Sequence, residues 1–166
     1  MKTILVPTDF SPAALNAAHY AAEIARFYVE NHFDLALVDI FRGTHQACLN
    51  SRGVVMALAH IDLRLKQISF ASVGNINACL YPETQPLNAV IRRGVLGYNL
   101  PNMRVNQQAL LPRQLLIMHS DGIHTINDLA TFSQQFSQLS ASDLANYILQ
   151  HKNNHLDDAT VLVMKT

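Results

Sequence analysis

Short apolar runs and stretches of helical periodicity divide the first part of the chain. Residues 2–6 form an apolar run with several β-branched side chains, which predicts a buried strand. Ser11 and Pro12 then predict a helix start, because a serine hydroxyl can cap the first turn and proline suits the first helical position. Alanines recur over residues 13–32 on more than one helical face. This pattern predicts a helix that is packed over much of its surface.

A second helix follows, and the pattern then changes to strands. We expect Asp34 to cap a helix that runs through residues 37–48 and ends near residues 50–53. Proline and glycine separate the β-type runs that come next. These runs predict strands over residues 54–62, 67–73, 77–81, 88–91, 105–110 and 114–119.

The last quarter returns to helical spacing. Helices are predicted over residues 127–136 and 141–152, and Ser140 with Asp143 resembles a capping box at the start of the second. An apolar strand is predicted over residues 159–164. Two helices, an antiparallel meander, two helices and a strand indicate an α+β fold rather than alternating βαβ units.

Composition narrows the class of protein. The chain has 166 residues, of which 49% are hydrophobic and 14% charged, and this suits one domain spanning residues 1–166. Lys plus Arg and Asp plus Glu both number 12, so the charge gives no reason to expect binding to nucleic acid or to a membrane. The N-terminal apolar run is too short for a signal peptide or a membrane span. We therefore expect a cytoplasmic protein with two free thiols, Cys48 and Cys79.

Two acidic clusters carry the candidate chemistry. Asp121 and Gly122 follow an apolar strand, and Asp157 and Asp158 precede the last strand. Carboxylates at strand ends can converge on a hard cation such as Mg²⁺ or Mn²⁺, which prefers oxygen ligands and keeps several waters. Each cluster alone is also typical of a turn or a solvated loop. The histidines near them, His119 among them, are interpreted as packing or loop residues because the eight histidines are scattered along the chain.

Several segments together resemble one protein family. FASVGNINACLY, RRGVLGYNLP, LLIMHSDGIH and LDDATVLVMK occur in the order and spacing of the PPM-type (type 2C) serine/threonine phosphatases. RGTHQACLNSRGVVMALAHIDL is similar to the segment that precedes them there. The closest resemblance is to the bacterial branch of sporulation and stressosome regulators, over about residues 25–165. It implies a layered α/β/β/α arrangement with mainly antiparallel strands.

The resemblance also implies an activity. Members of the family use two metal ions, Mn²⁺ or Mg²⁺, to activate a water that attacks a phosphoserine or phosphothreonine. By motif, Asp121 and Asp157 correspond to metal ligands, Gly122 to a tight turn beside the ion, and Asp158 to a residue that orients its neighbour or the loop. Gly74 and Asn75 match a turn of the family. Arg92 and Arg93 are candidates for binding the substrate phosphate, with a solvated pair as the alternative.

The N-terminal segment departs from the family. The bridging Asp of an Asp-Gly motif is expected before the first long helix, but Val6 stands at that place and Asp9 lies three residues away. Residues 1–26 instead resemble the opening strand and helix of universal stress proteins. The glycine-rich phosphate loop of those proteins is absent, which argues against nucleotide binding. The domain is thus interpreted as truncated at its N-terminus, or as having its first strand and helix replaced, by a natural or an engineered event.

Two functions fit this pattern. The first is a phosphatase, with impaired activity, that acts on a phosphorylated regulatory protein. The second is a catalytically inactive module that keeps the fold and binds a partner or a single metal. Because an upstream strand pair is missing, we also expect an exposed sheet edge and therefore a homodimer or a strand-exchanged oligomer.

Overall fold

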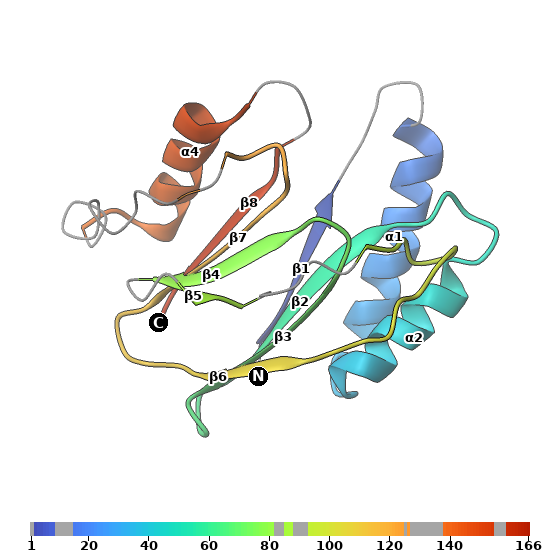
Figure 1. Cartoon of the computed structure of the whole chain (residues 1–166), viewed down its shortest axis with the longest axis horizontal. Helices are drawn as coiled ribbons and strands as arrows, with labels where there is room; N and C mark the ends of the chain where they lie inside the picture. Colours follow the sequence, from blue (N-terminus) through green and yellow to red (C-terminus); the bar gives the residue numbers. More distant parts are fainter. Residues whose placement is uncertain are drawn as a thin grey trace.

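The computed structural model is a layered α+β structure with two sheets at its centre (Figure 1). It describes residues 2–8, 15–81, 85–87, 93–124, 126, 138–154 and 159–166. The predicted helix start at residues 11–12, the strand over 88–91 and the helix over 127–136 lie outside the described residues.

The first sheet has four antiparallel strands in the order β1-β2-β3-β6. Its strands are β1 (Lys2–Thr8), β2 (Val55–Asp62), β3 (Gln67–Val73) and β6 (Asn106–Ala109). β1 pairs along its whole length with β2, from Lys2 opposite Ile61 to Thr8 opposite Val55. Residues 2–8 therefore supply an edge strand of this sheet.

The second sheet also has four strands, in the order β5-β4-β7-β8. They are β4 (Asn77–Tyr81), β5 (Gln85–Pro86), β7 (Leu115–His119) and β8 (Val161–Lys165), all paired antiparallel. The sequence predicted β4, β7 and β8 to within two residues at each end. It did not predict β5, because two residues are too short for a period of alternation to show.

Helices cover the outer faces of both sheets (Figure 1). α1 (Leu15–Asn31) and α2 (Leu37–Ala47) lie on the first sheet, and α4 (Ala141–Lys152) lies on the second. Asp34 does not cap α2, contrary to the prediction. The N-cap residue is Ala36, and no side chain caps this end of the helix. No helix among the described residues is long and apolar enough to cross a membrane.

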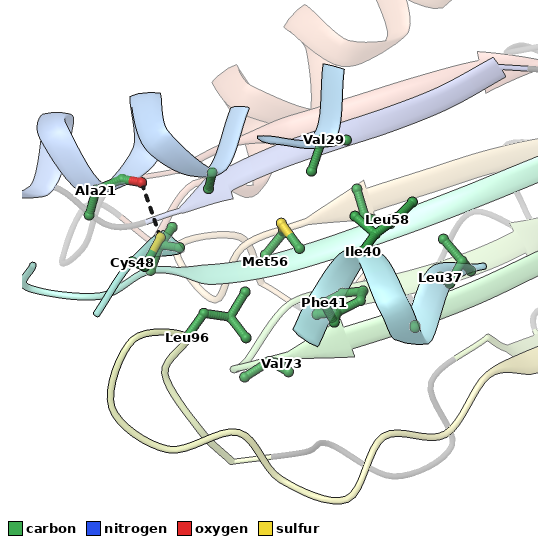
Figure 2. Packing of buried hydrophobic residues seen from close by; sticks show 13 residues of the cluster. Ala21, Val29, Leu37, Ile40, Phe41, Cys48, Met56, Leu58, Val73 and Leu96 are labelled. Carbon is green, nitrogen blue, oxygen red and sulfur yellow. Dashed lines mark hydrogen bonds between the residues drawn. The ribbon is translucent and has the colours of Figure 1, made fainter. Parts of the chain in front are cut away.

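Alternation along β2 and β3 divides their side chains between two cores. Ala57, Ala59 and Phe70 point between the sheets, where they meet Leu80, Leu116 and other buried side chains of the second sheet. Met56 and Leu58 point the other way, toward Ile40, Phe41 and Val29 of the helix layer (Figure 2). A third cluster lies under α4 and includes Ile117, Leu144 and Ile148. Both faces of each central strand are therefore buried.

Candidate functional site

Strand ends from both sheets gather at one end of the sandwich. In the first sheet, β1 ends at Thr8 opposite Val55, and β3 ends at Val73 opposite Met56. In the second, His119 at the end of β7 pairs with Asn77 at the start of β4 and with Val161 at the start of β8. Only residues 74–76 separate β3 from β4, so these ends of the two sheets are close together (Figure 1, top).

Asp121 lies at this end, in the turn that follows β7. Its carboxylate accepts a hydrogen bond from the side-chain amide of Asn75, which belongs to the β3–β4 connection. Both residues are exposed. The bond holds the carboxylate at the ends of the two sheets. Because Asp121 is exposed there, solvent and a ligand can reach its remaining lone pairs.

The turn that carries Asp121 is held by segments on either side of the second acidic cluster. Thr160 N–H donates to Ser120 Oγ at 2.9 Å, and Ser120 N–H donates to the Thr160 carbonyl oxygen at 3.1 Å. Asn154 N–H donates to the Gly122 carbonyl oxygen at 2.9 Å, and the Asn154 side chain donates to that of Asp121 at 3.1 Å. Asp157 and Asp158 lie outside the described residues, between Asn154 and Thr160 in sequence. Their flanking residues therefore both contact the Asp121 turn.

Gly74 is required by the backbone that brings Asn75 to the site. Its φ is +104°, which L side chains rarely adopt. A Cβ atom on this residue would also lie 2.5 Å from Val55 Cβ. The interpretation of Gly74 as a structural turn residue therefore agrees with its geometry. Asn75 does more than form a turn, and no local pattern in the sequence signals its bond to Asp121, 46 residues away.

His119 is buried next to the same turn and forms a hydrogen bond with its backbone. Its side chain is 7% exposed, and Nδ1–H donates to the Ser120 carbonyl oxygen at 2.8 Å. Burial lowers the pKa of His119, while this hydrogen bond and the nearby Asp121 act in the opposite direction. The neutral imidazole therefore positions the backbone of the turn, in line with its interpretation as a packing residue.

The other candidate residues are described in part. Arg93 is exposed and precedes Gly94, where an added Cβ would lie 3.1 Å from a methyl carbon of Val73, so Arg93 is near the end of β3. Arg92 and Asp9 lie outside the described residues. Asp9 follows Thr8, the last residue of β1, in sequence.

The donor atoms at this end suit a hard cation. The Asp121 carboxylate is an oxygen ligand of the kind that Mg²⁺ and Mn²⁺ prefer. Within the described ranges, no group of three or more His, Cys, Asp or Glu side chains is placed to hold a metal ion. A complete ligand set therefore needs residues beyond those ranges, and the sequence offers Asp157, Asp158 and Asp9.

Comparison with solved structures identifies the fold. A structure described as the bacterial stressosome, a modular system adapted to control secondary messenger signalling, contains a chain that is 28% identical, with a TM-score of 0.83, and the match covers 98% of this chain and 85% of that one. RsbX in complex with magnesium is 18% identical, with a TM-score of 0.78 and coverage of 99% and 81%. The Mycobacterium tuberculosis serine/threonine phosphatase PstP is 13% identical, with a TM-score of 0.68 and coverage of 98% and 87%.

No protein-family model and no curated protein matches the chain. The structural neighbours nevertheless include serine/threonine phosphatase PstP, a chain of the bacterial stressosome, and the PP2C phosphatase domain of the cell fate determinant SpoIIE from Bacillus subtilis. The expected layered arrangement of helices around two antiparallel sheets is confirmed by these neighbours and by the sheet pairing. The chain has the fold of the PP2C-type phosphatases.

Proposed function

We propose that this protein is a metal-dependent serine/threonine phosphatase-like domain of the stress-regulator type, with impaired activity. The observation that carries the proposal is the Asp121 carboxylate, held by Asn75 at the end of the sandwich where strand ends from both sheets gather. The substrate class is a phosphoserine or phosphothreonine of a regulatory protein. A partner within a protein regulatory complex is supported by the neighbour described as the bacterial stressosome.

The proposed cofactor is Mn²⁺ or Mg²⁺. Asp121 and Asp157 are the proposed ligands, with Asp158 and Asp9 as further candidates. RsbX, a neighbour of the same fold, is described in complex with magnesium. When bound, such an ion lowers the pKa of a coordinated water and neutralises charge on phosphoryl oxygens. Asn75 fixes the orientation of the Asp121 carboxylate, and Arg93 is a candidate cation for the substrate phosphate.

Impaired activity is proposed because of the residues that follow β1. The strand ends at Thr8 and leads to Asp9 and Phe10 instead of an Asp-Gly pair. A carboxylate that bridges two metal ions contributes to the binding of both. Its loss should therefore lower the affinity for both ions, and most of all the affinity for the second. The same observation favours the second candidate function, an inactive domain that binds a protein partner or a single ion.

The decisive experiment combines a metal titration with a phosphatase assay on the purified chain. We expect Mn²⁺ binding with a Kd above about 0.1 mM in calorimetry, and slow Mn²⁺-dependent hydrolysis of p-nitrophenyl phosphate. Asp121→Asn is expected to lower affinity and rate at least about tenfold, because it removes a charged ligand. Asn75→Ala is expected to weaken binding by a smaller factor, because it frees the carboxylate to rotate.

Asp39→Asn is the matched control, since Asp39 is an exposed carboxylate on α2. Metal binding without hydrolysis would support the inactive domain. Hydrolysis at a rate typical of an efficient enzyme would overturn the proposal that the activity is impaired. An absence of Mn²⁺ and Mg²⁺ binding at millimolar concentration would exclude the proposed metal site.

A further inference from the structure

Two turns meet at the end of the sandwich opposite Asp121. The β2–β3 turn lies at the bottom of Figure 1, and the turn after β6 lies beside it. Leu110 N–H donates to the Lys66 carbonyl oxygen at 2.7 Å and joins the two. Their exposed apolar and basic side chains form what we call the leucine-basic patch: Leu63, Arg64, Leu65, Lys66, Leu111 and Arg113.

The leucines of this patch are far more exposed than a core residue. Leu63 is 69% exposed, Leu65 is 65% exposed and Leu111 is 48% exposed. A single exposed leucine is ordinary on a protein surface. Three exposed leucines on two turns joined by a hydrogen bond are less usual, and exposed apolar residues that gather in this way are candidates for interaction sites.

Backbone conformation gives an independent indication at the same place. Lys66 has a φ of 49° and Arg113 a φ of 65°, both in the left-handed region. Glycine or asparagine adopts this conformation with less strain than a long side chain does. Each turn instead carries an exposed basic residue at its strained position. Such strain is often retained where the side chain has a function.

The charge of the patch is mainly positive, with three basic side chains beside one carboxylate, Asp62, whose pKa is lowered by the hydrogen bond from Leu65 N–H and to a smaller extent by the charge of Arg64. Arg64, Lys66 and Arg113 are exposed, and no acidic side chain among the described residues forms an ion pair with them. The nearby Asp62 accepts hydrogen bonds from the N–H groups of Arg64 and Leu65, both at 2.9 Å. Its carboxylate therefore holds the turn and faces the backbone.

We propose that the leucine-basic patch binds an acidic segment of a partner protein, one that carries apolar side chains among its aspartates and glutamates. The basic side chains attract such a segment, and the leucines give it an apolar contact. Anionic membranes are usually bound by clusters of about four to eight basic residues with interfacial aromatics, and this patch has neither. A symmetric pair of two copies would place like charges against each other.

The position of the patch has a consequence for the proposed function, although the inference does not depend on it. The patch lies on the β2–β3 turn, whereas Asp121 is beside the opposite ends of these strands. A partner bound here leaves the Asp121 end open. The patch is thus suited to anchoring the domain within an assembly.

A random 12-residue peptide display library selected on the whole chain tests this proposal. We expect the selected peptides to be enriched in Asp, Glu and aliphatic residues. Anisotropy with labelled synthetic copies should then show binding that weakens at least about tenfold in Leu63→Ser/Leu65→Ser and in Lys66→Glu/Arg113→Glu. Binding should also weaken in raised salt.

Leu35→Ser/Arg42→Glu is the matched control, because Leu35 before α2 and Arg42 on α2 are both exposed, and it should bind normally. Lys66→Gly separates binding from folding, since it removes a charge while relieving the left-handed backbone. It should bind the peptides less well and melt at the same temperature or higher. The proposal is overturned if no acidic peptide is enriched, or if the patch variants bind the selected peptides unchanged. Binding instead to vesicles of 30% phosphatidylserine, or patch-dependent dimerisation, would also overturn it.

Discussion

Cys48 follows the last residue of α2 and lies beside Ala21 of α1 (Figure 2). It has no exposed surface, and its sulfur lies 3.7 Å from the carbonyl oxygen of Ala21 in α1. Burial raises the pKa of the Cys48 thiol to about 11. Because the thiolate is the nucleophile, only about one thiol in a thousand is ionised at pH 8 even before access is considered.

We therefore predict that Cys48 resists alkylation in the folded protein. In a Cys79→Ala variant, iodoacetamide at pH 8 should label Cys48 at least about a hundredfold more slowly without urea than in concentrated urea. Cys48→Ala is the matched variant that reports on Cys79, which is half-buried. Comparable rates with and without urea would show that α1 and α2 do not cover the thiol.

The sequence predicts the roles of some single residues but not of others. The role of Gly74 could be predicted, because glycine between two β-type runs is a local signal of a turn. The bond of Asn75 to Asp121 could not, because it joins two sheets across 46 residues. Asp121 and Gly122 were found from their place after an apolar strand. The functional roles of all the candidate residues stay predictions, and Asp157, Asp158, Asp9 and Arg92 also lie outside the described ranges.

At the scale of elements, α4 offers a direct test of local stability. Ser140 Oγ accepts a hydrogen bond from Asp143 N–H at 3.0 Å, and its hydroxyl donates to the Asp143 carboxylate at 2.6 Å. The predicted cap is therefore present. Ser140→Ala is expected to lower the free energy of unfolding by about 1 kcal/mol, measured by urea denaturation.

Ser142→Ala is the control for this change, because Ser142 is exposed inside the first turn of the same helix. It should change the stability little or raise it slightly, since alanine has the higher helix propensity. Equal losses in both variants would mean that the hydroxyl of Ser140 does not stabilise α4 as a cap.

Elements with a clear period were the most predictable. β2 and β3 were predicted almost to the residue because each has apolar residues on both faces and ends at a turn. The predicted N-cap of α2, Asp34, was wrong. A capping residue is a local signal, and it does not reveal that the chain enters the helix at Ala36. β5 consists of two residues that pair with β4, and its existence depends on that neighbour.

At the scale of the whole molecule, β1 raises the question of assembly. Among the described residues β1 pairs with β2 alone, so its other edge is open. Pro7 lies in this strand, and proline is tolerated in strands mainly at sheet edges because it lacks an N–H group. Nothing in the arrangement of the described strands covers this edge.

We predict that the protein forms a homodimer or a strand-exchanged oligomer through this edge. Light scattering should give a mass above the monomer's 18.5 kDa at high micromolar concentration. Amide exchange of residues 2–6 should slow as the concentration rises, which would distinguish this edge from another contact. A clean monomer at these concentrations would count against the prediction.

Asn75 has a further consequence, because the connection to which it belongs passes from one sheet to the other. The distance between the sheets therefore sets the distance between the amide of Asn75 and the carboxylate of Asp121. The small side chains of Ala57, Ala59 and Ala78 let the sheets approach closely. The buried alanines thus help to set where Asn75 meets the Asp121 carboxylate, and substitutions there would change the proposed metal site without altering any residue in it.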